Sequence, residues 1–256
     1  MNTTTTHFYG NTAVLTRRSL RHILRSPDTI ITTAVMPVAI MVMFVYVLGG
    51  AINTGPYEYI DYMLPGILLI TVASGIAYTA FRLFTDLQSG VFERFQSMPI
   101  ARSSSLWAHV LTSLAANLMS LALVVGVALL LGFRTGAGPG AWLAVAGMLL
   151  LFTLALTWVA VVAGLSAKTV EGASAFSYPL IFLPFISSAF VPTDTMPGPV
   201  RWFAENQPVT SIVNSIRALF TQQSVGADLW LALAWCLGIM VVAYALAIST
   251  YKRRVS

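Results

Sequence analysis

Hydrophobic residues along this chain gather into six continuous runs that shorter polar segments separate. Each run is about 20 residues long, which is the length that an α-helix needs to cross the hydrocarbon core of a bilayer. The runs are continuously apolar and do not alternate with polar residues, so they predict helices and not barrel strands. We therefore predict an all-α integral membrane protein with six transmembrane helices, at about residues 30–48, 63–81, 108–131, 141–163, 174–191 and 229–250.

The positions of the arginine and lysine residues predict how these helices are oriented. With the N-terminus in the cytoplasm, the outer side holds only three of the 14 cationic residues, Arg134, Arg201 and Arg217. The inner side holds Arg17, Arg18, Arg21, Arg25, Arg82, Arg94, Arg102, Lys168, Lys252, Arg253 and Arg254. Because cytoplasmic loops carry the excess of positive charge, we expect both termini to be cytoplasmic. The chain is then one transmembrane domain over residues 1–256, with a cytoplasmic N-terminus (1–29), a six-span bundle (30–250) and a cytoplasmic tail (251–256).

The N-terminal segment has the pattern of an amphipathic helix. On a helical wheel, Arg17, Arg18, Arg21 and Arg25 share one sector, and the neighbouring sector is apolar. Such a helix lies at the surface of the inner leaflet, against anionic lipid. We predict an interfacial helix here, and the alternative is an ordinary basic flank of the first span.

Two prolines interrupt the fifth apolar run. Pro179 and Pro184 each remove a backbone donor and bend a helix. A membrane helix tolerates them when neighbouring groups, such as Ser177, Ser187 and Ser188, satisfy the freed carbonyls. The kinked helix is a candidate moving part, and a static kink that serves packing is equally compatible with the sequence.

The predicted outer loop at about 192–228 contains two short helical patterns. Its second half has apolar residues at helical spacing, namely Val209, Ile212, Val213, Ile216, Leu219 and Phe220, and Pro208 suits the first turn of that helix. Upstream, Pro197, Pro199, Trp202 and Phe203 suggest a short turn or helix at the membrane interface. We predict two short re-entrant helices that close the outer side, and we assign Met196, Pro197, Pro208 and Arg217 to this region.

Composition and missing motifs exclude several classes of protein. Charged residues make up 9% of the chain, against about 25% in soluble domains. Lys168 and Lys252, the two lysines, do not stand in a P-loop motif, so the chain has no such machinery to hydrolyse ATP. The histidines have no metal-ligand spacing, and we expect no metal site and no catalytic residues. No carboxylate lies inside the six predicted spans, which disfavours ion-coupled transport and suggests a soluble energising partner.

The predicted loop between the second and third spans has features of a docking element. Phe92, Phe95 and Met98 lie roughly on one helical face, while Glu93 and Arg94 face elsewhere. Pro99 ends the segment. A short amphipathic element at the inner membrane surface fits a groove on a partner protein, although it can also pack only on its own bundle.

Two stretches of sequence resemble one known family. The segment from Ser89 to Arg102, SGVFERFQSMPIAR, resembles the cytoplasmic signature of ABC-2 type permeases of the daunorubicin-resistance branch. The segments FVPTDTMP (190–197) and NQPVT (206–210), followed by Arg217, resemble the outer-loop pattern of that family. The two stretches occur in the right order and on the predicted sides of the membrane.

This resemblance implies a half-transporter in a bacterial cell membrane. Two six-span subunits pair, either two copies of this chain or this chain and a paralogue, and two cytoplasmic ATPase subunits bind ATP and Mg²⁺. The family's coupling helix matches Phe92, Glu93, Arg94, Phe95, Met98, Pro99 and Arg102. The N-terminal basic helix matches its elbow helix. No cofactor is expected on this chain, and no nucleic acid partner.

The resemblance also implies export of a hydrophobic or amphipathic small molecule, such as a drug or antibiotic. Candidate contacts with such cargo are Met43, Tyr78, Phe81, Phe182 and Phe185, although aromatic residues in spans more often pack against helices or lipid. Export of a lipid or glycolipid is the alternative. A secondary carrier and a membrane scaffold are remoter alternatives.

Overall fold

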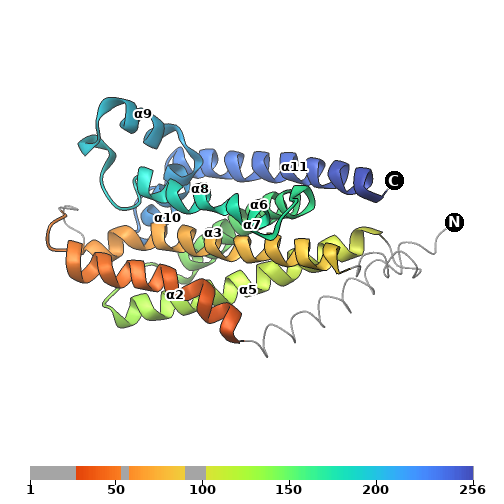
Figure 1. Cartoon of the computed structure of the whole chain (residues 1–256). Coiled ribbons are helices and arrows are strands. Elements are labelled where there is room, and N and C mark those ends of the chain that lie inside the picture. The colour runs from red at the N-terminus through yellow and green to blue at the C-terminus, as the bar shows by residue number, and fades with distance from the viewer. Residues whose placement is uncertain (1–26, 53–57, 90–101, 256) are drawn as a thin grey trace.

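The structure is a computed structural model that describes residues 27–52, 58–89 and 102–255. These residues form helices and turns, with no strand among them, which confirms the prediction of an all-α fold. The long helices run side by side in one bundle (Figure 1). In chain order the helices are α2 (Pro27–Met43), the π-helical turn η1 (Phe44–Leu48), α3 (Tyr59–Gln88), α5 (Arg102–Leu130), α6 (Pro139–Ser166), α7 (Val170–Ala175), α8 (Ser177–Phe182), η2 (Leu183–Ile186), η3 (Thr193–Thr195), α9 (Gly198–Asn206), α10 (Pro208–Phe220) and α11 (Asp228–Val255).

Four of these helices are long and apolar enough to cross a membrane, and they coincide with four of the predicted runs. Their apolar parts are Tyr59–Gln88, Leu106–Leu130, Pro139–Ser166 and Asp228–Tyr251. Shorter apolar helices, Thr33–Leu48 and Val170–Ile186, lie at the other two runs. The second, third, fourth and sixth predicted runs are therefore confirmed as helices of spanning length, and the six-span topology stays a prediction.

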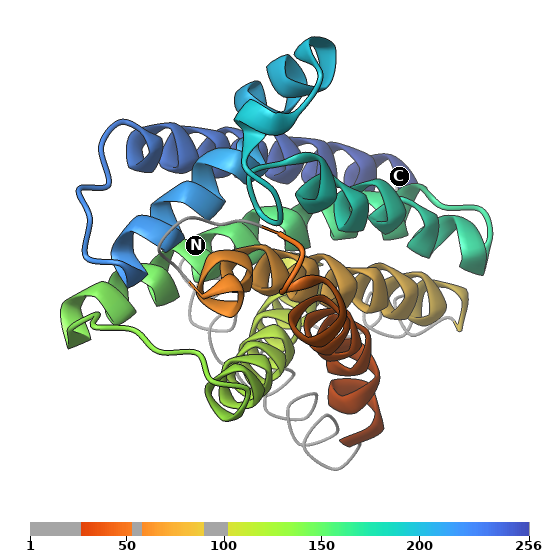
Figure 2. The ribbon, with the colours of Figure 1, turned by 90° about the vertical axis from the view of Figure 1, so that its left-hand side faces the viewer.

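Helix α3 occupies the centre of the bundle. It packs against α2, α5, α6, α7, α8 and α10, and the end view shows it enclosed by other helices (Figure 2). Its side chains from Met63 to Val72 are buried on every side of the helix, because apolar residues fill the whole circumference. Gly66 makes one of the close approaches possible: a Cβ atom there would lie 2.5 Å from the Cβ of Ala189.

The fifth predicted run does not form a single helix. It is divided into α7, α8 and η2, and the helical backbone ends at Ile186 because Ser187 is extended, with φ −141° and ψ −177°. The predicted span 174–191 is therefore wrong at its C-terminal end. Two serine hydroxyls bond to carbonyls near the breaks: Ser177 Oγ donates to Ser174 O at 2.7 Å and Ser187 Oγ donates to Pro184 O at 2.6 Å. These are not the carbonyls of Ala175 and Leu180, which Pro179 and Pro184 leave without a helical donor, so the predicted role of the serines stays a prediction.

The two short helices predicted before the last span are present as α9 and α10. Pro208 is the first residue of α10, and the apolar side chains Val209, Ile212, Val213, Ile216 and Phe220 of that helix are buried. The amphipathic pattern was therefore correct, because its apolar face packs against α3, α6 and α11. Helix α9 stands away from the bundle in both views (Figures 1 and 2), and Trp202 and Phe203 on it are exposed.

Candidate functional site

The residues predicted to couple to an ATPase lie mostly outside the described part of the chain. Phe92, Glu93, Arg94, Phe95, Met98 and Pro99 fall in the segment 90–101, and the elbow residues Arg17, Arg18, Arg21 and Arg25 precede residue 27. Arg102 is the first residue of α5. Along the chain, the predicted coupling segment thus lies between α3, which ends at Gln88, and α5. Both predictions stay untested.

Arg217 links three segments at the opposite end of α3. Its Nε and Nη2 atoms donate to Tyr62 O, each at 3.2 Å, and Nη2 also donates to Ser188 O at 2.6 Å. Nη1 donates to Asn214 Oδ1 at 3.2 Å, and the guanidinium carbon lies 3.8 Å from the centre of the Tyr62 ring. Among the described residues, no carboxylate forms an ion pair with Arg217. Carbonyl dipoles and the aromatic ring therefore stabilise this cation.

The corner between α9 and α10 is fixed to the broken fifth segment. The side-chain amide of Gln207, which is buried, donates to Leu183 O at 3.2 Å and also to Ile186 O. Thr210 Oγ1 donates to Ala204 O across the corner. Of the residues predicted for the outer region, Met196 and Pro197 immediately precede α9, and Pro208 begins α10. Hydrogen bonds from the side chains of Gln207 and Thr210 to backbone carbonyls thus fix the segments of this region to one another.

Aromatic rings from three elements meet between α3 and the broken fifth segment. Phe44 of η1 lies 4.9 Å from Phe190 and 6.2 Å from Phe185, measured between ring centroids. Phe185 and Phe190 stack at 4.9 Å, and Tyr59 Oη donates to Phe190 O at 3.2 Å. Phe185 was a predicted path residue, whereas Phe44 and Phe190, which centre the cluster, were missed because their proximity depends on the break in the fifth segment.

The other predicted path residues are distributed over two places. Phe182 lies 6.2 Å from Phe185 and is exposed, as is Met43 beside Phe44. Tyr78 and Phe81 lie 6.1 Å apart on α3, and Tyr78 is exposed. Among the described residues no ring contact joins the pair on α3 to the pair near η2. The structure therefore separates the five residues into two groups, and contact of either group with cargo stays a prediction.

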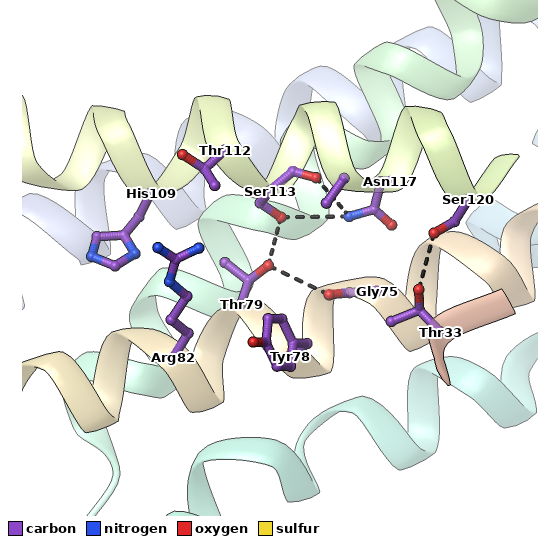
Figure 3. Close-up of a pocket in the computed structure, with 11 residues that line it drawn as sticks. Thr33, Gly75, Tyr78, Thr79, Arg82, His109, Thr112, Ser113, Asn117 and Ser120 are labelled. Atoms are coloured by element: carbon purple, nitrogen blue, oxygen red, sulfur yellow. Dashed lines mark hydrogen bonds between the residues drawn. The ribbon is translucent and has the colours of Figure 1, made fainter. Parts of the chain in front are cut away.

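A polar cleft lies between α2, α3 and α5, inside an otherwise apolar bundle (Figure 3). One hydrogen-bonded group in it consists of Thr79, Ser113 and Asn117. The Thr79 and Ser113 hydroxyl oxygens lie 2.5 Å apart, and Asn117 Nδ2 donates to Ser113 O at 3.0 Å. The cleft is lined by Thr33, Gly75, Tyr78, Thr79, Arg82, His109, Thr112, Ser113, Ala116, Asn117 and Ser120.

The two ends of the polar cleft differ in charge. At one end the hydroxyls of Thr33 on α2 and Ser120 on α5 lie 2.9 Å apart. At the other end Arg82 and His109 lie together (Figure 3), and His109 Nε2 lies 3.3 Å from Asp86 Oδ2. Charged groups thus collect toward the end of α3 that leads into the coupling segment, and neutral groups occupy the rest.

Asn117 is the residue of the polar cleft whose hydrogen bonding is incomplete. It is 1% exposed, and its Oδ1 atom has no partner. Gly75 leaves the space that this side chain occupies, since a Cβ atom at position 75 would lie 2.1 Å from Asn117 Oδ1. Because buried polar atoms are nearly always paired, an unpaired one on the wall of a cleft requires an explanation.

The sequence contained a signal for the polar cleft that was missed. His109, Ser113, Asn117 and Ser120 follow one another at intervals of three or four residues inside an apolar run. This spacing places them on one face of a helix. Gly75, Thr79, Arg82 and Asp86 follow the same rule on α3. The predicted second span ended at residue 81, whereas α3 continues to Gln88 and therefore includes Arg82 and Asp86.

The helical bundle, its apolar spans and the cleft within them define a polytopic α-helical membrane protein. The family model for ABC-2 type transporters matches residues 11–221. The chain therefore belongs to the ABC-2 type transporter family, whose members are the permease subunits of ABC transporters.

Two relatives are similar over most of their length. The chain is 30% identical to the daunorubicin resistance ABC transporter permease protein DrrB1 of Streptomyces coeruleorubidus, over 89% of this chain and 81% of that protein. It is 29% identical to the probable doxorubicin resistance ABC transporter permease protein DrrC of Mycobacterium tuberculosis, over 96% of this chain and 90% of that protein. The resemblance inferred from the two motifs is thereby confirmed.

Proposed function

We propose that this chain is the membrane-spanning subunit of an ABC exporter that moves a hydrophobic or amphipathic drug-like molecule out of a bacterial cell. The observation that carries the proposal is the similarity to two permeases named for daunorubicin and doxorubicin resistance, which extends over nine-tenths of the chain. The wide aromatic and apolar surfaces of the bundle suit such cargo, since ligand sites for small molecules are mostly apolar with a few polar groups.

In this proposal the chain spans the cytoplasmic membrane six times and keeps both termini in the cytoplasm. It pairs with a second copy or with a paralogous permease, in contact with membrane lipid. Two ABC ATPase subunits bind ATP and Mg²⁺, because this chain has no P-loop of its own. The basic N-terminal segment forms the elbow helix, and α9 and α10 re-enter the outer leaflet.

Helix α3 is the element through which ATP-driven movement would reach the outer side. One end of α3 continues into the coupling segment at residues 90–101, and the other end carries Tyr62, which accepts two hydrogen bonds from Arg217. A tilt of α3 driven from the cytoplasm would therefore change the hydrogen bonds that hold α10 against α3. Such rigid-body movement of packed helices is a common way of switching access.

The proposal is tested by isolating the tagged full-length chain from its native membrane under mild detergent. We expect a P-loop ATPase to co-purify in equal amount, and inverted membrane vesicles to accumulate daunorubicin only when ATP is supplied. Vesicles without the chain serve as the control. Purification of intact chain without an ATPase, or accumulation driven by an ion gradient alone, would contradict the proposal.

Changes in the coupling segment should separate ATP hydrolysis from transport. Arg94→Ala and Met98→Asp are each expected to lower ATP-dependent daunorubicin accumulation by about tenfold, the effect of losing roughly 1.4 kcal/mol of interface contact. Folding should be unaffected, and ATP hydrolysis by the complex should no longer respond to the drug. Arg253→Ala, which removes another predicted cytoplasmic cation, is the matched control. Normal export by both variants would mean that the coupling element lies elsewhere.

A further inference from the structure

We propose that the polar cleft between α2, α3 and α5 binds a neutral hydrogen-bond donor, a hydroxyl group, of an amphipathic molecule whose apolar part remains beside Tyr78. The inference rests on the proposed function in one respect, namely that the exported molecule is one occupant of the polar cleft. A hydroxylated lipid is the other source of the same chemistry.

The first step of the argument concerns the acceptor. Asn117, which lines the polar cleft, already donates from Nδ2 to Ser113 O, and its buried Oδ1 atom lies next to Gly75 without a donor. A carbonyl oxygen of this kind accepts hydrogen bonds and cannot donate them. A hydroxyl that enters the polar cleft would satisfy it, whereas an ether or ester oxygen would place two acceptors against each other. At Asn117 the polar cleft therefore favours a ligand group that donates a hydrogen bond over one that can only accept it.

The second step concerns size. The free volume of the polar cleft is about 20 Å³, which is enough for one water molecule or one small functional group. A whole drug-sized molecule does not fit. The polar cleft is therefore a subsite for a single polar substituent, and a hydroxyl that replaces a water molecule there can reproduce its hydrogen bond to Asn117.

The third step concerns charge. The guanidinium of Arg82 and the ring of His109 line the same polar cleft, and His109 lies 3.3 Å from the Asp86 carboxylate. The Arg82 guanidinium is a cation. An ammonium group in the polar cleft would be repelled by it inside a bundle of low dielectric constant. A neutral hydroxyl avoids this repulsion, which is why we favour it over an amine.

The fourth step concerns the apolar part of the ligand. Tyr78, at the rim of the polar cleft, is 38% exposed, and its ring lies 6.1 Å from that of Phe81. The two rings offer an apolar platform directly beside the hydrogen-bonding groups. A molecule with a flat or aliphatic body and one hydroxyl would thus contact both surfaces together.

The test uses a photoreactive long-chain alcohol and its methyl ether, which differ only in the donor. The full-length chain is reconstituted in phosphatidylcholine nanodiscs, because this headgroup carries no hydroxyl. We expect the alcohol to label peptides that contain Tyr78 or Asn117 about ten times more than the ether does. Equal labelling by the two probes would overturn the inference.

Asn117→Leu is the decisive variant, since leucine has nearly the shape of asparagine without the acceptor. It should abolish the preference for the alcohol, and the unfolding temperature should not fall, because the unpaired buried oxygen is removed. A lower unfolding temperature with the preference intact would show a merely structural role and overturn the proposal. Leu118→Ala, at an exposed position of the same helix, should leave the preference unchanged.

Gly75→Ala gives a second route to the same result if Asn117→Leu does not fold. Its methyl group would displace the Asn117 oxygen, so the preference should again disappear, whereas Gly126→Ala, where a Cβ meets nothing within 4 Å, should retain it. Competition by daunorubicin would identify exported cargo as an occupant. Selective labelling that daunorubicin does not reduce would support the site and assign it to a hydroxylated lipid. Failure of daunorubicin export in vesicles would count against the proposed function alone.

Discussion

Replacing Gly66 with valine is expected to lower the free energy of unfolding by about 3 kcal/mol, because the new side chain has no space. A Cβ atom at position 66 would lie 2.5 Å from the Cβ atom of Ala189, a fully buried residue. Each of these atoms is bonded directly to the backbone. Neither atom can rotate away. Helix α3 would have to separate from the segment that follows η2. Thermal unfolding of the purified chain in mild detergent, followed by tryptophan fluorescence, measures the effect.

Gly147→Val in α6 is the matched control for this variant. The glycine lies inside another long apolar helix, and a Cβ atom there meets nothing within 4 Å. We expect a change of less than about 1 kcal/mol, which covers the difference in helix propensity between the two residues. If both valine variants unfold like the wild type, α3 and the segment at Ala189 do not pack as closely as described.

Replacing Arg217 with alanine should destabilise the end of the bundle where α10 packs on α3 by about 2–3 kcal/mol. The variant loses the hydrogen bonds that the Arg217 guanidinium donates to Tyr62 O and Ser188 O. It also loses the cation–π contact at 3.8 Å. We expect a lower unfolding temperature and earlier proteolytic cleavage between Ile186 and Pro208, since this stretch is held to α3 through Arg217.

Two further variants identify the cause of that effect. Arg217→Lys keeps the charge but lacks the planar fork, so its stability should fall between those of the wild type and of the alanine variant. Arg201→Ala removes an exposed arginine whose partner is Glu205 at 2.7 Å on the same helix, and it should leave the unfolding temperature nearly unchanged because exposed ion pairs contribute little. Equal stability of Arg217→Ala and Arg201→Ala would contradict the proposed role of Arg217.

Long apolar runs were the part of the fold that the sequence predicted best. Four runs match long helices, three of them to within three residues at each end, because membrane length and apolar composition constrain both. Five of the six apolar residues predicted for the buried face of α10 are buried, and Leu219 is half-buried, since this apolar face is wide and regular. Ends were less accurate: α3 extends to Gln88, beyond the predicted end at 81, because a helix continues past the apolar core when its polar residues find partners such as His109.

The fifth segment and the polar cleft show where prediction from sequence stopped. Pro179 and Pro184 predicted a distorted helix, but not that the helix ends before Ser187. That end depends on Gln207, 20 residues further along the chain, which donates hydrogen bonds to the carbonyls of Leu183 and Ile186 near the break. The polar cleft depends on two helices facing each other. The row of polar residues on each helix can be predicted from the sequence. The contact between the two rows, at Thr79 and Ser113, depends on how the helices pack and cannot be predicted in that way.

The burial of Cys236 has a practical consequence. It is the one cysteine of the chain, and in α11 its side chain is 0% exposed. Maleimide and methanethiosulfonate reagents therefore have no accessible native thiol on the folded protein. If one cysteine is introduced on α9 and another at the exposed position 78 of α3, these two thiols are the ones that react. Spin labels or fluorophores can then be attached without first replacing Cys236. Distances between such labels, with and without ATP, would measure directly whether the outer helices move.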